Sequence, residues 1–323
     1  MISAVIMAGY QNRREVKRYS KIVAENYGEA FIETGYKPLR EFPVIENGVA
    51  TTKPLIQFII DMLLKIREIE EIVIVGHQML LEQRLGDYFK AIGQTLKIIN
   101  QNKGLSDEVI SRFQVVPRHT KYNSLAGNMI KGYMETKASR EPRHVLFAAS
   151  DSPLTSPAFV RDFLDSATKR FGEAAIIVPA VFINGKEDRL GRKPLKLVND
   201  TCYPMNGYVD PHGRQGFRLS SLLLANLDGF DVNTVNTAYN LRKFLNPAVQ
   251  LRLFKITRNL GFANVYSKYF IKRDLSITDC EKITSGFFRG PLTLIPMEDE
   301  AASFDYDGTE REYQMISEML KKE

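Results

Sequence analysis

Cysteine is scarce in this chain of 323 residues, which contains only Cys202 and Cys280. The two lie far apart in the sequence and lack the spacing of metal ligands, so the sequence excludes a disulfide framework and indicates a reducing compartment. Histidine is also rare, and its four scattered positions give no zinc-binding pattern. Residues 1–7 carry neither the basic flank nor the cleavage site of a signal peptide, and we expect a cytoplasmic protein.

Long apolar runs and dense basic runs are missing as well. No segment approaches the about 18 apolar residues that a membrane span requires, so we expect no transmembrane segment. The net charge of +6 is spread along the chain, which favours anionic ligands in general. Because no arginine-rich run with interleaved aromatic residues occurs, nucleic acid is not an expected partner.

The composition that remains is that of a globular protein, with 44% apolar and 25% charged residues. This length allows one large domain with an insertion, or two domains of usual size. Predicted strands at 4–7, 72–76, 96–99, 145–149 and 174–181 alternate with helices at 54–66 and 80–92 and others that open near 124 and 157. This alternation predicts an α/β fold, a Rossmann-like and mostly parallel sheet with helices on both faces.

The pattern changes after residue 181. A basic loop at 191–196 precedes a turn-rich segment at 199–216 and helical stretches at 234–244, 248–260, 262–271 and 277–287. We therefore expect residues 182–290 to form loops and a helical insertion over the carboxyl edge of the sheet formed by residues 1–181. Residues 291–323 should return to that core with a strand at 292–296 and a final helix at 309–320.

An aspartate follows one of the buried strands directly. Asp151 comes after the apolar run that starts near Arg143, and a Ser-Pro turn and a helix near Pro157 follow it. In an open α/β sheet the carboxyl ends of the strands face the ligand crevice, so Asp151 is well placed to hold a metal or a ligand. The alternative is that it only caps the turn or the next helix, which is common for aspartate.

A second acidic feature precedes the final helix. Asp305 and Asp307 are two positions apart, so their side chains point to the same face of an extended segment. Two like charges that close repel each other unless a cation lies between them. The alternative is again a cap, in which Asp307 or Thr309 only starts the final helix.

Basic residues occupy the loops that follow the first strand. Gly9 is followed by a polar segment with Arg13 and Arg14, at the place where α/β sheets often hold phosphates. The alternative is a solvated basic loop. Lys37 precedes a proline, so we expect an extended backbone there and a side chain that projects from a loop.

Polar residues also lie at the start of the helix that opens near 124. Ser124 can cap this helix, and small polar residues such as Ser124 and Asn128 can also contact a base or a ribose. From the residues alone, a plain capped helix is the favoured interpretation.

Taken together, these segments resemble the nucleotidyltransferases of the glycosyltransferase-A type fold, and among them the molybdenum-cofactor-guanylyltransferase-like NTP transferases. The resemblance covers most of the chain. It is carried by Ala4-Val5-Ile6-Met7-Ala8-Gly9, Gly35-Tyr36-Lys37-Pro38-Leu39, Thr52-Lys53-Pro54-Leu55-Ile56, Ile72-Val73-Ile74-Val75-Gly76, Asn123-Ser124-Leu125-Ala126-Gly127-Asn128, Ala149-Ser150-Asp151-Ser152-Pro153 and Phe304-Asp305-Tyr306-Asp307-Gly308-Thr309-Glu310. The fold it implies is the nucleotide-diphospho-sugar transferase type, with residues 1–181 as the nucleotide-binding core.

The resemblance also implies roles for individual residues. The implied catalytic residues are Lys37, Arg14 and Asp151, and the implied nucleotide-binding residues are Ala8, Gly9, Arg13, Ser124 and Asn128. The implied ligands of a Mg²⁺ ion are Asp151 and Asp307, with Asp305 as the alternative to Asp307. Arg192 and Lys196, in the basic loop, are candidates to bind an anionic acceptor, and the alternative is a solvated loop.

These roles indicate a Mg²⁺-dependent nucleotidyltransferase that transfers a nucleoside monophosphate from an NTP to a phosphorylated small molecule and releases pyrophosphate. One alternative is a glycosyltransferase of the same fold that uses a nucleotide sugar. Another is a non-catalytic nucleotide-binding protein, because the nucleotide loop has Tyr10 and Asn12 where the family has glycines. Side chains there keep the backbone further from a triphosphate than glycine would.

Overall fold

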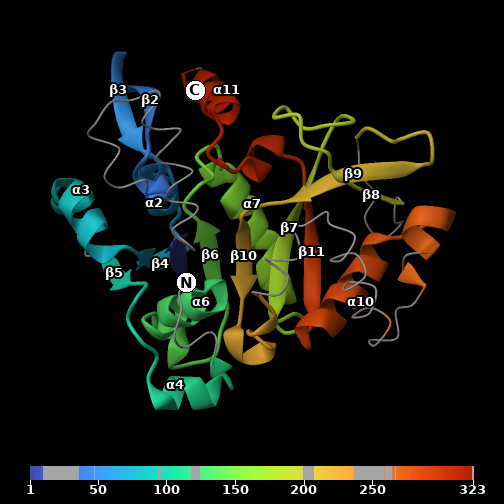
Figure 1. Ribbon diagram of the computed structural model, residues 1–323, viewed down its shortest axis with the longest axis horizontal. Coiled ribbons are helices and arrows are strands. Elements are labelled where there is room, and N and C mark those ends of the chain that lie inside the picture. The colour runs from blue at the N-terminus through green and yellow to red at the C-terminus, as the bar shows by residue number, and fades with distance from the viewer. Residues whose placement is uncertain are drawn as a thin grey trace.

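The computed structural model describes residues 1–9, 36–46, 48–93, 96–117, 124–198, 207–235, 258, 264–265 and 267–321 (Figure 1). Its strands are β1 (Ile2–Ala8), β2 (Glu41–Glu46), β3 (Val49–Pro54), β4 (Ile69–Gly76), β5 (Lys97–Asn100), β6 (Val145–Ala149), β7 (Ile176–Phe182), β8 (Leu195–Val198), β9 (Arg214–Leu219), β10 (Leu222–Ala225) and β11 (Leu292–Met297). Its α-helices are α2 (Leu55–Leu64), α3 (Gln78–Ala91), α4 (Asp107–Arg112), α6 (Leu125–Met134), α7 (Pro157–Ala167), α10 (Ile277–Phe288) and α11 (Glu310–Leu320). Shorter turns include the 3-10 helices η2 (Lys37–Leu39) and η7 (Glu300–Ser303).

A nine-stranded sheet organises the described residues, in the order β5-β4-β1-β6-β10-β7-β9-β8, with β11 also paired to β7. The pairs β1–β4, β1–β6, β4–β5 and β7–β11 are parallel. Strand β10 runs antiparallel between β6 and β7, and β9 runs antiparallel to both β7 and β8. The sheet is therefore mostly parallel, as the alternation of strands and helices predicted.

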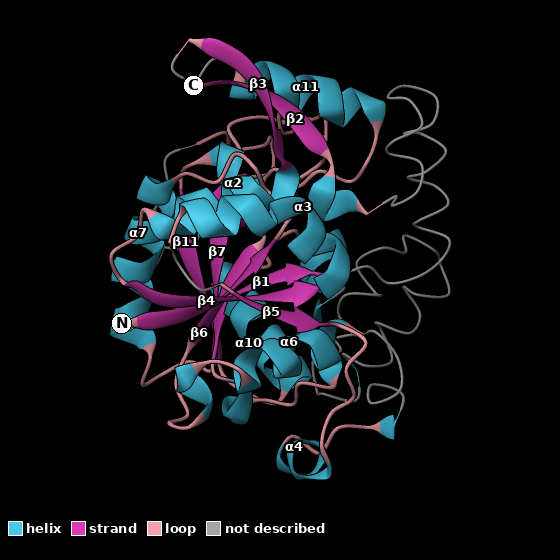
Figure 2. Ribbon diagram, turned by 90° about the vertical axis from the view of Figure 1, so that its left-hand side faces the viewer, coloured by secondary structure: helices cyan, strands magenta, loops and turns pink. Residues whose placement is uncertain are grey.

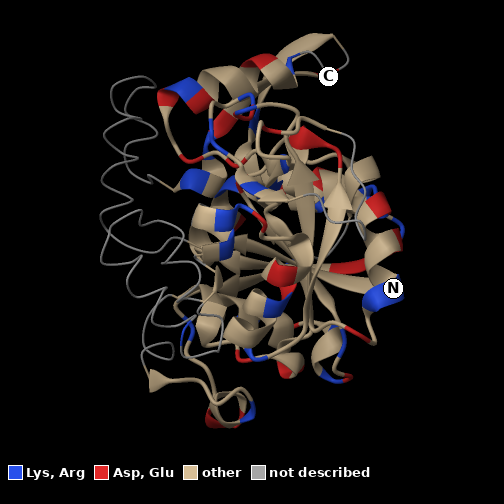
Figure 3. Cartoon of the chain, turned by 90° about the vertical axis from the view of Figure 1, so that its right-hand side faces the viewer, with Lys and Arg blue, Asp and Glu red and all other residues tan. Residues whose placement is uncertain are grey.

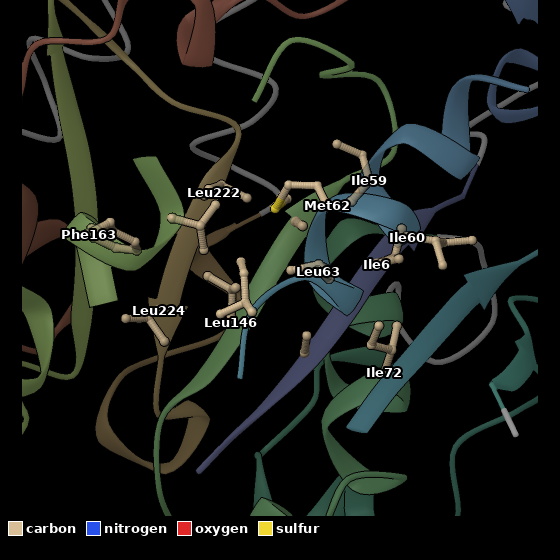
Figure 4. Packing of buried hydrophobic residues seen from close by; sticks show 14 of the residues in the cluster. Ile6, Ile59, Ile60, Met62, Leu63, Ile72, Leu146, Phe163, Leu222 and Leu224 are labelled. Atoms are coloured by element: carbon tan, nitrogen blue, oxygen red, sulfur yellow. The ribbon is translucent and has the colours of Figure 1, made fainter. Parts of the chain in front are cut away.

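Both faces of the sheet are apolar because its strands alternate two sets of buried residues. On β1, Ala4 and Ile6 pack in the cluster that contains α2 and α7, whereas Val5 packs in the cluster that contains α6. Figure 2 shows these helices on opposite sides of the fan of strands, and Figure 4 shows Ile6 beside residues of α2. Burying a side chain of this size contributes about 1.5–3 kcal/mol. Packing on both faces therefore stabilises the register that places the carboxyl ends of β1, β4 and β6 side by side.

The structure differs from expectation between residues 182 and 225. This region was expected to hold only loops before its helices, yet it adds β8, β9 and β10 to the sheet. Strand β9 escaped prediction because one of its faces is basic, with only the Gln215 and Phe217 side chains buried. All three expected parts of the chain, 1–181, 182–290 and 291–323, thus supply strands to one sheet. Of the expected helices in the middle part, 277–287 is confirmed as α10, and most of 234–263 lies outside the described residues.

A hairpin that was not expected joins the end of the chain to its beginning. Strands β2 and β3 pair antiparallel, and α11 lies against β2 (Figure 1). Phe42 packs edge-on against Tyr306 with ring centroids 5.2 Å apart, and Tyr313 completes the group at 4.7 Å from Phe42. This contact brings the segment before α11 over the sheet. In the part of the chain that is described, no helix has the length and apolar character that crossing a membrane requires.

Candidate functional site

Asp151 lies in the turn that ends β6, at the carboxyl edge of the parallel strands. The turn is fixed on both sides, because the Ser150 amide donates to the Met7 carbonyl at 3.3 Å and the Ala149 amide donates to the Ser221 carbonyl at 3.1 Å. The hydroxyls of Ser152 and Ser221 are also hydrogen-bonded to each other. The position of Asp151 is therefore set by backbone contacts to the strands or strand ends beside β6, while its side chain keeps 22% exposure.

The cap interpretation of Asp151 is wrong. Helix α7 is capped by Ser156, whose hydroxyl accepts a hydrogen bond from the Phe159 amide at 3.1 Å, and Pro157 follows at its first turn. The carboxylate of Asp151 instead forms an ion pair with the ammonium of Lys37, which lies 114 residues earlier in the chain. Asp151 is thus part of a long-range charged site.

Lys37 reaches this site because the residue before it is anchored in the sheet. The buried Tyr36 hydroxyl donates to the carbonyl of Ala8 at the end of β1 and accepts from the His77 amide, 3.1 Å away, just after β4. Lys37 then begins η2, which the Arg40 amide closes by donating to the Lys37 carbonyl at 3.1 Å. The extended backbone expected for Lys37 is therefore wrong, whereas its projection toward a ligand site stays a prediction.

The acidic segment before α11 is tied directly to Asp151. The Tyr306 amide donates to the Asp151 carbonyl at 2.7 Å, so residues 305–307 run beside the turn after β6. The cap of α11 is Thr309, whose hydroxyl accepts from the Glu312 amide at 3.2 Å in a capping box. Gly308 adopts φ +92°, which an L side chain rarely does, and so turns the chain between the acidic segment and the cap. The Asp307 side chain is therefore not the cap of α11.

The two carboxyls of this segment differ in their surroundings. Burial alone would raise the pKa of Asp305, but the charges of Arg192 and Lys37 outweigh it and lower that pKa. Burial raises the pKa of Asp307, the charge of Asp305 raises it further, and the opposing charge of Lys37 is too small to restore it. Asp151 acts on Asp307 in the same direction as Asp305. Asp307 is thus a carboxyl with an excess of negative charge around it.

A group of buried ion pairs borders the site on the side of β9. Asp188 accepts from the Arg192 amide and from Arg192 Nε, both at 2.8 Å, and its side chain is fully buried. Arg192 also forms an ion pair with Asp305 and donates to the Ser303 carbonyl at 3.0 Å. Arg192, expected to bind an acceptor, therefore uses its guanidinium on Asp188, Asp305 and Ser303.

Lys196, the other residue expected to bind an acceptor, lies on β8. Its ammonium donates to the Gly185 carbonyl at 3.4 Å and lies 4.7 Å from the centre of the Tyr208 ring. Burial lowers the pKa of Lys196, and the nearby charge of Arg214 adds to this against the opposing charge of Asp210. Lys196 is thus a half-buried ammonium that makes no ion pair with a described carboxylate.

The residues expected to bind a nucleotide gather at the opposite part of the edge, after β1 and β5. A Cβ atom at Gly9 would lie 2.6 Å from Asn128 Nδ2 and 3.0 Å from Gln101 Oε1, so only glycine fits there without a shift. Ser124 is the cap of α6 and accepts from the Gly127 amide at 3.0 Å. Asn128 is 5% exposed, and its Oδ1 has no hydrogen-bond partner among the described residues. Arg13 and Arg14 lie outside the described residues.

Asp151 and Asp307, on neighbouring segments, are the candidate carboxylates for a divalent cation. Among the described residues, no group of three or more His, Cys, Asp or Glu side chains is arranged to hold a metal. Mg²⁺ does not need such a cage, because it keeps several waters and usually takes one or two carboxylates together with substrate phosphates. The raised pKa of Asp307 agrees with such a role, since a cation would supply positive charge that its surroundings lack.

Comparison with known proteins was made at the levels of sequence and structure. No protein-family model and no curated protein matches the sequence. Among solved structures, a hypothetical transferase from Thermus thermophilus is 18% identical, with a TM-score of 0.55 over 97% of this chain and 99% of that chain. A CMP:2-keto-3-deoxy-manno-octonic acid synthetase complexed with CTP is 11% identical, with a TM-score of 0.51 over 99% of this chain and 98% of that chain. The chain has the fold of these transferases.

Within this transferase fold, several site residues had escaped the sequence patterns. Tyr36 and Tyr306 had no expected role. The Tyr36 hydroxyl anchors the segment before Lys37, and the Tyr306 amide donates to the Asp151 carbonyl. Asp188 gave no signal because a lone acid in a polar loop is common. Arg218 also lies near this site. Its position could have been predicted only if β9 had been recognised as a strand. Figure 3 shows how basic and acidic segments mix between the sheet and the C-terminal helix.

Proposed function

We propose that this protein is a Mg²⁺-dependent nucleotidyltransferase that transfers a nucleoside monophosphate from an NTP to a phosphorylated small molecule. The observation that supports this best is the contact of Lys37 with Asp151, beside the acidic segment that holds Asp307. Three charged groups from distant parts of the sequence meet there at the carboxyl edge of a parallel sheet, which is where α/β folds bind their ligands. The transferase fold supports the proposal independently.

The proposed reaction is an in-line displacement at the α-phosphorus of the NTP. An oxygen of the acceptor phosphate forms the new bond to this phosphorus, the bond to the bridging oxygen of the β-phosphate breaks, and pyrophosphate leaves with that electron pair. Such a transfer depends mainly on positioning and on stabilising charge. Bound Mg²⁺ would neutralise charge on the phosphates, held by Asp151 and Asp307.

The chain supplies the remaining positive charge and the binding surface. The Lys37 ammonium is held at the site by the anchored Tyr36 and would neutralise phosphate oxygens. Arg14 and Arg13 are proposed for the triphosphate from the sequence resemblance alone. Gly9 and Ala8 would let the nucleotide approach the end of β1, with Ser124 and Asn128 across from them on α6.

A release assay tests this function. The protein is incubated with Mg²⁺, each of the four NTPs in turn and a pool of sugar and alcohol phosphates, and free pyrophosphate is measured. CTP is tested first, because the structurally similar synthetase was solved with CTP. Pyrophosphate that depends on both an NTP and an acceptor supports the proposal. Hydrolysis of a nucleotide sugar without pyrophosphate release would favour a glycosyltransferase, and binding of NTP without either product would favour a non-catalytic protein.

Asn128 provides a prediction that separates stability from binding. Asn128→Leu removes a buried oxygen that has no described partner and keeps a similar side-chain volume. A buried unsatisfied polar atom costs about 1–3 kcal/mol, so we expect the free energy of unfolding to rise by about 1 kcal/mol. NTP binding should weaken at least about tenfold if this oxygen contacts the nucleotide, which corresponds to about 1.4 kcal/mol. Denaturant unfolding and calorimetric titration measure the two quantities, and a destabilised variant with unchanged NTP affinity would contradict the role.

The pH dependence gives a second prediction, for Asp305→Asn. Burial is the main cause of the raised pKa of Asp307, and the charge of Asp305 adds to it, against Lys37 and together with Glu312 and Asp151. Asp307 must be ionised to bind a cation, so activity is lost as the pH falls through its raised pKa. Removing the charge of Asp305 lowers that pKa, and we expect the acid limb of kcat/KM to move to lower pH.

The profile is measured beside that of Asp165→Asn, a change at an exposed position on α7. This control should leave the acid limb where it is in the unchanged protein. An acid limb that stays in place or moves to higher pH in Asp305→Asn contradicts the assignment of Asp307. Complete loss of activity at every pH would instead assign Asp305 as the metal ligand.

A further inference from the structure

One face of the short antiparallel unit β8–β9 carries basic side chains beside the proposed reaction site. In the register of this pair, Lys196 lies opposite Gly216, so both face the same side. Arg218 is two positions from Gly216 on β9 and therefore shares that face, whereas Gln215 and Phe217 turn into the buried side. Lys196 and Arg218 are thus diagonal neighbours on one face, which Arg214 shares on the other side of Gly216.

The guanidinium of Arg218 makes fewer and longer polar contacts than that of Arg192. Its one ion pair with a described carboxylate is between Nε and Asp188 Oδ2 at 3.4 Å, and this Nε is buried without a hydrogen-bond partner among the described residues. Asp188 is already engaged by Arg192, through shorter contacts of 2.8 Å. The Arg218 side chain is nevertheless only 24% exposed. A guanidinium that is largely buried and weakly paired has capacity for another anion.

Arg192 is in the opposite situation. Its guanidinium binds Asp188, Asp305 and the Ser303 carbonyl at once. It joins the loop before β8 to the acidic segment, and so it holds Asp305 in place. Binding an acceptor through Arg192 would require breaking contacts that are already made, whereas binding through Arg218 would not.

We propose that Arg218 and Lys196 form the subsite that binds the anionic group of the acceptor, a phosphate or a carboxylate, and that Arg192 is a positioning residue for Asp305. This inference rests on the proposed function and assigns the acceptor side of the same site. The planar guanidinium of Arg218 suits two oxygens of such a group, and the ammonium of Lys196 adds a second charge. Arg218 and Arg192 both contact Asp188, and Arg192 also pairs with Asp305, so the subsite lies beside the acidic segment.

Gly216 keeps the space between the two cations open. A Cβ atom there would lie 3.0 Å from Lys196 Nζ and 2.7 Å from Pro194 Cγ. The shorter contact is with the ring of the buried Pro194, so this ring and the start of β8 would have to shift together with the flexible lysine. Gly216→Ala should therefore weaken anion binding by shifting the start of β8 and Lys196 without changing any charge.

Binding of inorganic phosphate to the full chain tests the subsite without requiring turnover. The titration is followed by ³¹P NMR for the unchanged protein, Arg218→Gln, Arg218→Lys, Lys196→Gln and the control Arg189→Gln, whose exposed arginine lies in the same loop as Arg192. We expect phosphate binding to weaken at least tenfold in Arg218→Gln, less in Arg218→Lys, and severalfold in Lys196→Gln, with no change in Arg189→Gln. An acetate titration shows whether a carboxylate binds there as well as a phosphate.

Equal phosphate affinity in Arg218→Gln and Arg189→Gln overturns the proposal, and so does the absence of saturable binding in the unchanged protein. Folding is checked by thermal melting. Arg192→Gln should melt several degrees lower because Asp188 and Asp305 lose their main partner, while Arg218→Gln leaves both pairs intact. If phosphate binding depends on Arg218 but no NTP yields pyrophosphate, the proposed function fails and the subsite stands. If pyrophosphate is released but Arg218→Gln leaves the KM for the acceptor unchanged, the subsite proposal fails and the proposed function stands.

Discussion

Asp151→Asn is expected to reduce Mg²⁺-dependent pyrophosphate release by about 10³-fold. The substitution keeps the size of the side chain but removes the charge with which this residue would hold the cation. Charge stabilisation by a bound metal is worth several kcal/mol in the transition state, and each 1.36 kcal/mol corresponds to about tenfold in rate. The fold should survive, because the backbone hydrogen bonds that place Asp151, from the Ser150 amide to Met7 and from the Tyr306 amide to Asp151, do not involve the carboxylate.

The rate is measured with saturating NTP over a range of Mg²⁺ concentrations, with Asp165→Asn as the control. Asp165 lies on the exposed side of α7, which follows Asp151 in the chain, so the control makes the same chemical change outside the site. A rate within a factor of two of the unchanged protein would remove Asp151 from the metal site. Recovery of the Asp151→Asn rate at high Mg²⁺ would show that the defect lies in binding the cation.

Lys37→Met should lower kcat by about 10²–10³-fold, the range seen when one preorganised donor to a charged transition state is removed. Methionine keeps much of the apolar stem of lysine, so the contacts of η2 should survive. The variant loses only the ammonium, which is the ion-pair partner of Asp151 and lies 5.9 Å from the centre of the Tyr306 ring. Both side chains of this ion pair are largely buried, so removing the ammonium should lower the free energy of unfolding by about 1–3 kcal/mol.

The kinetic constants of Lys37→Met are compared with those of Lys65→Met, which removes an exposed lysine after α2. Lys37→Arg serves as the charge-preserving variant and should retain more activity than Lys37→Met. An increase in KM with no change in kcat would mean that Lys37 contributes to ground-state binding only. Equal activity in Lys37→Met and Lys65→Met would contradict any role for Lys37 in the transfer.

The sequence was informative where local patterns decide the structure. The apolar run before Asp151 predicted a strand that ends at this residue, and β6 ends two positions before it. The final helix was placed at 309–320, and α11 begins after the Thr309 cap. Strand–helix alternation then predicted that the central strands run mostly parallel. These features depend on periodicity and caps, which neighbouring residues determine.

Long-range contacts were beyond the reach of such patterns. The pairing of Lys37 with Asp151 and that of Arg192 with Asp305 join residues that are more than 100 positions apart. Whether Asp151 caps a helix was therefore open until its partner Lys37 was known, and its binding of a cation stays a prediction. The basic loop pointed to Arg192 for the acceptor, but its carboxylate partners come from separate segments and occupy it.

Some expectations stay predictions. The fold is shared with transferases, whereas the resemblance to molybdenum-cofactor-guanylyltransferase-like enzymes, the use of Mg²⁺ and a cytoplasmic location rest on the sequence. The nucleotide loop with Tyr10, Asn12, Arg13 and Arg14 lies outside the described residues. Whether this loop binds a triphosphate is therefore tested by the pyrophosphate-release assay.

The central claim is that the site transfers a nucleotide, and the fate of the α-phosphate tests it most directly. The protein is incubated with Mg²⁺, an NTP labelled with ³²P at the α-phosphate and a pool of phosphorylated acceptors, and the products are separated. We predict that the label appears in a new nucleoside diphosphate conjugate that resists phosphatase, and that it does not appear there with Asp151→Asn. Label that stays in the NTP, or is found only in free nucleoside mono- or diphosphate, would contradict the proposed transfer.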